Sequence, residues 1–215
     1  RLPSSSFHSW RWQSAPLETQ LDVRASAPAC GATLMSSPHG KIRWECLAPA
    51  ADLVGHVHGV PRAGRGYCEE LEMNVAPWRV PISTLIWGRF VADAPGEGQT
   101  HVVWIKWEGP MPLCVVFCSG AHCHAASIEP LTIAADSWHL SLQEVAVLRD
   151  GKLGSGPLAR IPGLARLAPR GLRRLLDTHE HKVLSRGRLF KDGAEYSGWA
   201  ISEVVQFGEL TPETT

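Results

Sequence analysis

Residues 101–108 read HVVWIKWE, and the alternation of their side chains decides the fold class. Successive side chains of an extended strand point to opposite faces. One face of this stretch therefore carries His101, Val103, Ile105 and Trp107, and the other carries Val102, Trp104, Lys106 and Glu108. Each face combines a tryptophan with a polar residue. The stretch predicts a partly buried β-strand that brings a tryptophan into the interior whichever face is turned inward.

Similar short apolar stretches recur along the chain, separated by Gly, Pro and Asp. Residues 138–148 repeat the period of two most clearly, and further strands are expected at 33–36, 41–47, 53–57, 67–74, 82–92, 113–119, 125–133, 182–190 and 198–207. About ten strands with little helix between them favour an antiparallel barrel or sandwich over a parallel α/β fold. We expect an irregular lead-in at 1–18 and a single β-barrel domain over 19–210.

Residues 157–178 break this pattern, because PLARIPGLARLAPRGLRRLLDT places apolar residues at helical spacing with arginines between them. Pro162 and Pro169 stand near the starts of two short helices, where proline is tolerated. The segment predicts a short basic helical insertion at about 155–180 that caps the barrel. The alternative is peripheral contact of residues 158–176 with an anionic membrane surface.

The composition excludes several classes of protein. With 44% hydrophobic and 20% charged residues, the chain of 215 residues is typical of a globular protein, and its formal net charge of zero gives no indication of a nucleic-acid partner. It has no apolar run of transmembrane length. The six cysteines form no CxxC motif and sit mostly in apolar strand patterns. We therefore expect reduced thiols and a cytoplasmic location.

The leading candidates for chemistry lie on the strand expected at 67–74. Tyr67, Glu69, Leu71 and Met73 share one face, which combines a phenol and a carboxylate with two large apolar groups. A carboxylate in such surroundings can act as a general acid or base, with Tyr67 as proton donor or orienting group. The alternative is that Glu69 pairs with a buried arginine and only stabilises the barrel.

Arg89 is a candidate partner for a carboxylate. In LIWGRF, residues 85–90, Leu85, Trp87 and Arg89 share one face, and Gly88 leaves room for close approach of another group. A guanidinium among aromatic rings can stack on them and bond a carboxylate, either that of Glu69 or one on a ligand.

Aromatic residues predict the walls of a pocket. Nine tryptophans exceed the two tyrosines and five phenylalanines, and tryptophan supplies a large flat apolar surface whose N–H needs a partner when it is buried. The expected ligand is a hydrophobic or aromatic small molecule. The expected ligand-binding residues are Trp78, Trp87, Trp104, Lys106, Trp107, Trp199 and Glu203. The alternative is that the tryptophans only fill a large core, and that Lys106 is a surface lysine.

Paired histidines are a weaker indication of a metal site. Three His-x-His pairs, at 56/58, 122/124 and 179/181, each place two imidazoles on one strand face, and Glu45, Glu69 or His101 could supply a further ligand. The spacing alone is not specific to metal sites, so no metal is assigned. No P-loop, GxGxxG, GxSxG or HExxH motif is present, and no cofactor is expected.

The stretches GRGYCEELEM (64–73), PWRVPISTLIWGRF (77–90), HVVWIKWEG (101–109), KVLSRGRLF (182–190) and GWAISEVVQFG (198–208) together resemble the lipocalin-like carotenoid 1,2-hydratase family and its AttH-type relatives. This resemblance implies a calycin-type antiparallel barrel, a hydrophobic ligand and non-redox acid–base chemistry on an alkene or polyene. It places Tyr67 and Glu69 at the polar end of the pocket, near Trp87, Arg89 and Trp104. Residues 70–73 depart from the family pattern, and the chain has the length of one barrel where the family commonly has two.

Three functional hypotheses follow. The first is a lyase- or isomerase-type enzyme (hydratase, isomerase or cyclase) in which Glu69 is the acid or base, Tyr67 assists and Arg89 binds or orients charge. The second is a non-catalytic carrier of a hydrophobic small molecule. The third is a metal-dependent enzyme that uses the histidine pairs.

Overall fold

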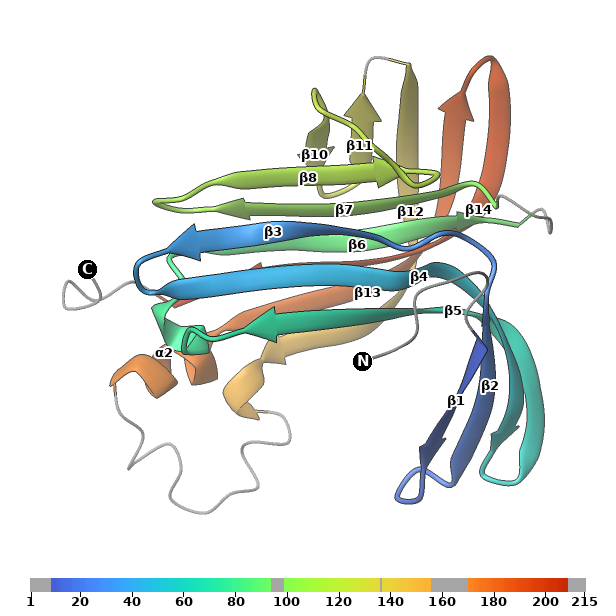
Figure 1. Cartoon of the computed structure of the whole chain (residues 1–215), viewed down its shortest axis with the longest axis horizontal. Helices are drawn as coiled ribbons and strands as arrows, with labels where there is room; N and C mark the ends of the chain where they lie inside the picture. Colours follow the sequence, from blue (N-terminus) through green and yellow to red (C-terminus); the bar gives the residue numbers. More distant parts are fainter. Residues whose placement is uncertain (1–8, 94–98, 136, 156–169, 209–215) are drawn as a thin grey trace.

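Two antiparallel sheets make up nearly all of the structure. The computed structural model describes residues 9–93, 99–135, 137–155 and 170–208. The smaller sheet has the order β1-β2-β4-β3, with β5 on the other edge of β4 (Figure 1). Its strands are β1 (Ser9–Ser14), β2 (Thr19–Ala25), β3 (Cys30–Ser37), β4 (Gly40–Val57) and β5 (Val60–Met73).

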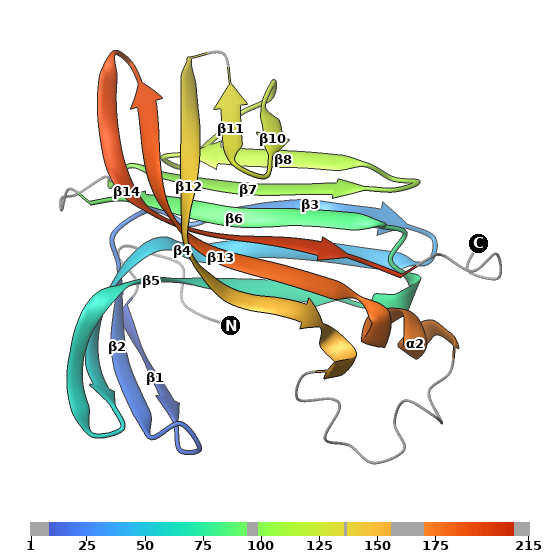
Figure 2. The same ribbon diagram turned by 180° about the vertical axis from the view of Figure 1, so that it is seen from behind.

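The larger sheet has nine strands in the order β10-β11-β12-β13-β14-β6-β7-β8-β9. These are β6 (Thr84–Ala92), β7 (His101–Glu108), β8 (Leu113–Cys118), β9 (Ala121–His122), β10 (Ser127–Glu129), β11 (Thr132–Ala135), β12 (Trp138–Lys152), β13 (His179–Lys191) and β14 (Ala194–Gln206). The sheet curls, so that β10 to β12 lie over one face of β6 to β8 (Figure 2). A core that includes Phe90, Trp104, Ile133 and Leu140 fills the space enclosed by this curl.

The opposite face of the larger sheet packs on the smaller one. Trp44 and Cys46 of β4 contact Val103 and Ile105 of β7 in a second buried cluster. Strand alternation explains how the two faces of one sheet pack in two different cores. Leu85, Trp87 and Arg89 point to one side of β6. Ile86 and Phe90 point to the other. The candidate functional site lies between the two sheets.

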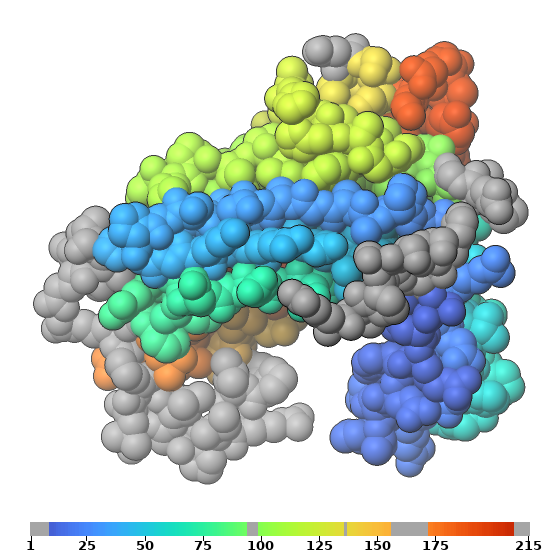
Figure 3. All heavy atoms as spheres, in the orientation of Figure 1, coloured from blue at the N-terminus to red at the C-terminus, as the bar shows by residue number. Residues whose placement is uncertain are grey.

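The outer halves of β4 and β5 extend beyond this packed region and pair with β1 and β2 to form an arm. Figure 3 shows the arm standing apart from the α2 end of the molecule. A small cluster that includes Val23, Ala25 and Ala51 holds the arm together. The smaller sheet thus closes one side of the site with the inner halves of β3, β4 and β5.

The predicted all-β antiparallel fold with a short helical insertion is confirmed: the curled sheet forms a lipocalin-like half-barrel. Residues 101–108 form β7 with the expected bounds. The strands expected at 41–47 and 53–57 are two parts of β4, which continues through bulges near Ala48. Residues 9–14, within the stretch expected to be irregular, form β1, since they pair with β2 along their whole length.

The insertion between β12 and β13 includes a 3-10 turn, η2 (Leu153–Ser155), and a helix, α2 (Arg170–Asp177). Residues 156–169, where the first of the two helices was expected, lie outside the described residues. Arg174 is not at a solvated surface, because its side chain is only 7% exposed. It donates hydrogen bonds to the carbonyls of Trp78 and Val80 and to that of Gly208. This arginine docks α2 against η1 (Pro77–Arg79), as a cap would.

No helix in the described part of the chain is long and apolar enough to cross a membrane.

Candidate functional site

A cavity of about 440 Å³ lies between the two sheets. Its walls come from β3 to β7, β13 and β14 and from the segment around η1. Most lining side chains are apolar, and they include Ile42, Leu71, Met73, Ile105 and Phe207. The volume is within the range of small-molecule sites, and an apolar lining with a few polar groups is typical of them.

The polar end of the cavity is organised around the carboxylate of Glu69. Arg89 Nη2 donates a hydrogen bond to Glu69 Oε2 at 2.8 Å, and Trp44 Nε1 donates to the same oxygen at 3.0 Å. Across the described part of the chain, no hydrogen bond reaches Oε1. The Glu69 side chain is 27% exposed. One carboxylate oxygen is therefore fixed, and the other is free to meet a ligand.

Arg89 lies behind this carboxylate and is itself almost fully buried, at 3% exposure. Its guanidinium carbon lies 3.2 Å from the centroid of the Tyr67 ring and 4.7 Å from that of the Trp87 ring. Stacking of a guanidinium on aromatic faces is favourable and fixes its orientation. The stacked arginine therefore positions Glu69 and does not itself reach into the cavity.

Tyr67 provides a phenol beside Glu69. Burial raises the pKa of the Tyr67 hydroxyl, with the negative charge of Glu69 acting in the same direction and the positive charge of Arg89 opposing it. The hydroxyl makes no hydrogen bond within the described residues, and it is not among the fully buried unpartnered atoms. Tyr67 therefore presents a protonated and accessible O–H on the same face of β5 as Glu69.

Two thiols lie on the other side of Arg89. Arg89 Nη1 is 3.5 Å from Cys46 Sγ, and Cys46 is opposite Cys30 across β3 and β4. A hydrogen bond with Cys30, reinforced by the charge of Arg89, lowers the pKa of the Cys46 thiol against the opposing effect of burial. The same hydrogen bond, together with burial, raises the pKa of the Cys30 thiol. All six cysteines are free thiols.

An ion pair occupies the middle of the cavity wall. Lys182 Nζ lies 2.8 Å from Glu203 Oε2, and it is 5.9 Å from the centroid of the Trp87 ring. Burial alone would lower the pKa of Lys182, but the hydrogen bond and the charge of Glu203 outweigh it and raise that pKa. Both groups are thus charged and neutralise each other.

The structure brings some of the expected site residues together and separates others. Tyr67, Glu69, Trp87, Trp107 and Glu203 line the cavity, and Arg89 supports it from behind.

The remaining expected ligand-binding residues lie elsewhere. Trp104 is packed in the core of the curl, because the other face of β7 is turned toward the cavity. Lys106 shares the face of Trp104 and bonds the Ile128 carbonyl at 3.3 Å. Trp78 is 37% exposed, and Trp199 is 44% exposed beneath Arg186.

Trp44 and Lys182 belong to the site but were not expected there from the sequence. The sequence could have placed Lys182 in the site through the Asp192-Gly193 pair. Asp-Gly favours a two-residue hairpin turn, and such a turn fixes which residues of the two strands are paired. Both turn residues have positive φ, and Lys191 pairs with Ala194. Counting outward from this turn places Lys182 opposite Glu203. The same count from the turn at 58–59 fails for Trp44, since bulges between Cys46 and Ala51 shift the register.

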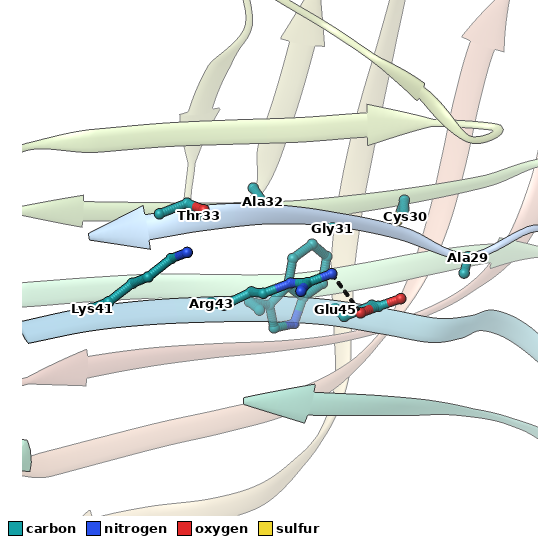
Figure 4. A pocket seen from close by; sticks show the side chains of 9 residues that line it. Ala29, Cys30, Gly31, Ala32, Thr33, Lys41, Arg43 and Glu45 are labelled. Atoms are coloured by element: carbon teal, nitrogen blue, oxygen red, sulfur yellow. Dashed lines mark hydrogen bonds and ion pairs between the residues drawn. The ribbon is translucent and has the colours of Figure 1, made fainter. Parts of the chain in front are cut away.

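A second concavity, of about 430 Å³, lies over β3 and β4 (Figure 4). It gathers Lys41, Arg43 and Glu45, and Arg43 Nη2 lies 3.2 Å from Glu45 Oε2. Both of these side chains are well exposed, so their charges are screened by solvent. This surface groove lacks the buried polar groups that distinguish the cavity between the sheets.

The histidine pairs do not assemble into a cluster of ligands. His179 Nε2 and His181 Nδ1 both contact Asp150 Oδ1, at 3.3 and 3.4 Å, and the rings of His122 and His124 lie 4.5 Å apart. Within the ranges that the structure describes, no three His, Cys, Asp or Glu side chains come together in a way that could hold a metal ion.

Comparisons with solved structures identify the fold. Kievitone hydratase from Nectria haematococca superimposes with a TM-score of 0.54 at 12% sequence identity, over 92% of this chain and 64% of its own. The chain shares its fold with a hydratase. CghA, solved with Sch210972, gives a TM-score of 0.52 at 11% identity, over 90% of this chain and 62% of its own.

This chain therefore spans a little under two thirds of the length of these proteins. No family model and no curated protein sequence matches it. At such low identity, the likeness is one of fold.

Proposed function

We propose that this protein is a non-redox acid–base enzyme, of the hydratase, isomerase or cyclase type, that acts on a hydrophobic or aromatic small molecule in the cavity between the sheets. The observation that carries this proposal is the arrangement of Glu69. One of its oxygens is fixed by Arg89 and Trp44, and the other has no hydrogen bond among the described residues, while Arg89 contacts both Glu69 and the ring of Tyr67. A catalytic carboxylate needs this combination of fixed orientation and one open oxygen.

Glu69 and Tyr67 have complementary roles in this proposal. Glu69, ion-paired with Arg89, is the base of the reaction. The raised pKa of Tyr67 keeps its proton in place, so Tyr67 starts as the donor. In a hydration, Glu69 takes a proton from a water whose oxygen bonds to one alkene carbon, and Tyr67 delivers a proton to the other carbon. The proton on Glu69 then returns to Tyr67 through solvent.

Arg89 and Trp44 act through Glu69 and are positioning residues. The apolar walls exclude water from most of the substrate, which strengthens the electrostatic interactions at the polar end. The names of the fold neighbours support a reaction of this kind, since kievitone hydratase is by name a hydratase and CghA was solved with a small molecule bound.

The test is proton transfer to and from a panel of alkene-containing and enolisable aromatic compounds. Incubation in D₂O followed by mass spectrometry detects addition of water, isomerisation and carbon-bound deuterium in the same samples. We expect at least one compound to react, and we expect Glu69→Gln to lower its rate by at least about 100-fold, because the base is lost. Glu70→Gln is the matched control, since Glu70 is the exposed neighbour on the opposite strand face. It should retain the full rate.

The result also distinguishes the enzyme from a carrier. Equal rates in the wild type and in Glu69→Gln would contradict the catalytic role of Glu69. Tight binding of panel compounds, with no turnover of any of them, would favour the carrier, for which a cavity of this size and lining is equally suitable.

A further inference from the structure

Lys182 is the only cation among the described residues that line the cavity. Its side chain is 30% exposed, whereas that of Arg89 is 3% exposed and lies behind Glu69. Burial lowers the pKa of Lys182, but the hydrogen bond and the charge of Glu203 outweigh it and raise that pKa. Lys182 is therefore an ammonium in the wall of the cavity.

Strand pairing places Lys182 in one row with Glu203 and Trp87. Lys182 is paired with Glu203 across β13 and β14, and Glu203 is paired with Trp87 across β14 and β6, which lie side by side (Figure 2). Directly paired residues of neighbouring strands point to the same face and lie about 5 Å apart. The ring of Trp87 contacts that of Tyr67, with 5.9 Å between the centroids, and the charge of Lys182 acts on the Tyr67 hydroxyl. The row thus brings Lys182 within electrostatic reach of the proposed proton donor.

The Lys182 ammonium has a hydrogen-bond donor to spare. An ammonium carries three N–H donors. Lys182 Nζ lies 2.8 Å from Glu203 Oε2 and 3.9 Å from Glu180 Oε1, and the second distance is too long for a hydrogen bond. Among the described residues, Glu203 is therefore the one acceptor in hydrogen-bond range of Nζ. A further N–H is left for an oxygen of a ligand.

The acid of the proposed reaction indicates which double bonds can react. Burial raises the pKa of the Tyr67 hydroxyl, so Tyr67 is a weak acid. A weak acid does not protonate an isolated alkene, because the resulting carbocation is far more acidic than a phenol. It does protonate the carbon of an enolate. Glu69 and Tyr67 together are therefore suited to a double bond that is conjugated to a carbonyl group.

In such a substrate, negative charge develops on the carbonyl oxygen. When Glu69 takes a proton from water, its charge passes through the attacking oxygen and the double bond to that carbonyl. Arg89 remains buried behind Glu69 and does not follow the charge into the cavity. A donor fixed where an oxyanion develops lowers the barrier of the reaction. Lys182 has the charge, the exposure and the spare N–H for this role.

We propose that Lys182 is a further catalytic residue, which donates a hydrogen bond from Nζ to the carbonyl oxygen of an apolar or aromatic enone and stabilises the enolate formed from it. In a hydration, Glu69 takes a proton from water as the water oxygen bonds to the alkene carbon farther from the carbonyl. The electron pair of the double bond leaves the negative charge on the carbonyl oxygen. Tyr67 then protonates the carbon next to the carbonyl, which restores the C=O bond, and the proton on Glu69 returns to Tyr67 through solvent. This inference rests on the proposed function and narrows its substrate class.

The first experiment measures stabilisation of an oxyanion without turnover. The probe is 4-nitrophenol, whose phenolate carries its charge on one oxygen, as an enolate does, and is detected by its absorbance. It is titrated with Glu69→Gln protein, in which the neutral amide stands for the protonated Glu69 of the enolate state. We expect bound 4-nitrophenol to ionise at least about one pH unit below the free phenol.

Further substitutions in the Glu69→Gln protein test whether Lys182 causes this shift. Lys182→Met combined with Glu203→Gln removes the ammonium without leaving the carboxylate of Glu203 unpaired, and it should abolish the shift. Lys182→Arg keeps a cation and should retain the shift. Lys152→Met is the matched control, because Lys152 is also ion-paired, with Asp177 at 3.0 Å, but is not part of the cavity lining. It should leave the shift unchanged.

The second experiment measures turnover with Glu69 in place. Chalcone and 1,3-diphenylpropene both have two phenyl rings and a double bond, and only chalcone has a carbonyl group. We expect the wild type to add water to chalcone and not to 1,3-diphenylpropene, measured by mass spectrometry. Lys182→Met with Glu203→Gln should lower the rate with chalcone by at least about 100-fold, and Lys152→Met should not change it.

The outcomes separate this inference from the proposed function. If bound 4-nitrophenol shows no shift in Glu69→Gln, or keeps the shift without Lys182, then Lys182 does not stabilise an oxyanion and the inference is wrong. If Glu69-dependent turnover is found for carbonyl-free alkenes and is unaffected by loss of Lys182, the proposed function stands and the enone class is wrong. If no panel compound shows Glu69-dependent turnover, the proposed function fails, and the 4-nitrophenol titration still decides the role of Lys182.

Discussion

Gly88 leaves the space that the ring of Trp104 occupies in the core of the curl. A β-carbon at this position would lie 2.4 Å from Trp104 Cζ2 and 2.8 Å from the Ile201 carbonyl oxygen. Because Trp104 is buried on all sides, it cannot move away. We expect Gly88→Ala to lower the free energy of unfolding by about 2 kcal/mol, measured by urea denaturation.

Gly64→Ala is the matched control, since no atom lies within 4 Å of the corresponding β-carbon. We expect that substitution to leave the stability within about 0.5 kcal/mol of the wild type. Equal effects of the two substitutions would show that strand propensity, and not the contact with Trp104, governs stability at Gly88.

The candidate site shows which residues a sequence can reveal. Tyr67, Glu69 and Arg89 could be found because alternation within one strand shows which side chains share a face. Trp104 and Lys106 could not be excluded in the same way, because alternation does not show which face is turned inward. That choice depends on the curl of the larger sheet over Trp104, and the curl depends on pairings such as Trp138 with Lys191 that are far apart in the sequence.

Arg174 anchors the helix α2 to the rest of the molecule. Its guanidinium donates to the carbonyls of Trp78, Val80, Ile82 and Gly208, which lie in η1 and the segments that flank it and near the end of the described chain. Removal of the side chain would take a donor from each of these carbonyls, including the buried ones of Val80 and Ile82. Among the described residues, only that of Val80 keeps a backbone donor, Ile82 N–H, so the loss is costly. We expect Arg174→Ala to lower the free energy of unfolding by about 3 kcal/mol, measured by urea denaturation.

Arg188→Ala provides the control for the loss of an arginine. Arg188 is exposed on β13, and its removal should change the stability by less than about 0.5 kcal/mol. Because Val80 and Ile82 also line the cavity, Arg174→Ala should in addition weaken the binding of those panel compounds that the wild type binds there. Unaltered stability in Arg174→Ala would mean that α2 is not docked through this side chain.

The insertion between β12 and β13 can be predicted only in part from the sequence. The helical spacing of leucines correctly indicated a helix at α2, and the run of arginines suggested a solvated or membrane-facing surface. Arg174 is an exception, because it is surrounded by backbone carbonyls from segments almost a hundred residues away in the sequence. Burial lowers its pKa, as expected for a cation withdrawn from water. No local pattern distinguishes such an arginine from its exposed neighbours.

The architecture of the whole molecule also lies beyond what local patterns give. The number and type of strands follow from alternation and turn residues, and the Asp192-Gly193 turn sets the register of the longest hairpin in the larger sheet. However, the chain forms two sheets with a cavity between them, and not one closed barrel. The division depends on long-range pairing, such as that of Gly198 with Ala92, which joins β14 to β6.

The stability of the molecule should depend on pH through His101, which is 1% exposed. Burial lowers its pKa below the ordinary value of 6.5, the charges of Lys191 and Arg89 act in the same direction, and its hydrogen bond with the Gln99 carbonyl opposes them. Below pH 6.5, the unfolded chain therefore binds a proton at His101 that the folded protein does not. The free energy of unfolding should fall as the pH decreases from 6.5 toward the lowered pKa.

Urea denaturation at pH 7.5, 6.5 and 5.5 measures this dependence, and proton NMR of the histidine ring gives the pKa directly. His101→Gln, which retains a polar group at the position, should have a smaller decrease in stability between pH 6.5 and 5.5 than the wild type. His39→Asn is the control, because His39 is exposed and its removal should leave the decrease unchanged. If His101 instead titrates at or above 6.5, it is protonated in the fold, and the pH dependence of stability must come from the carboxylates, which lose their charge at lower pH.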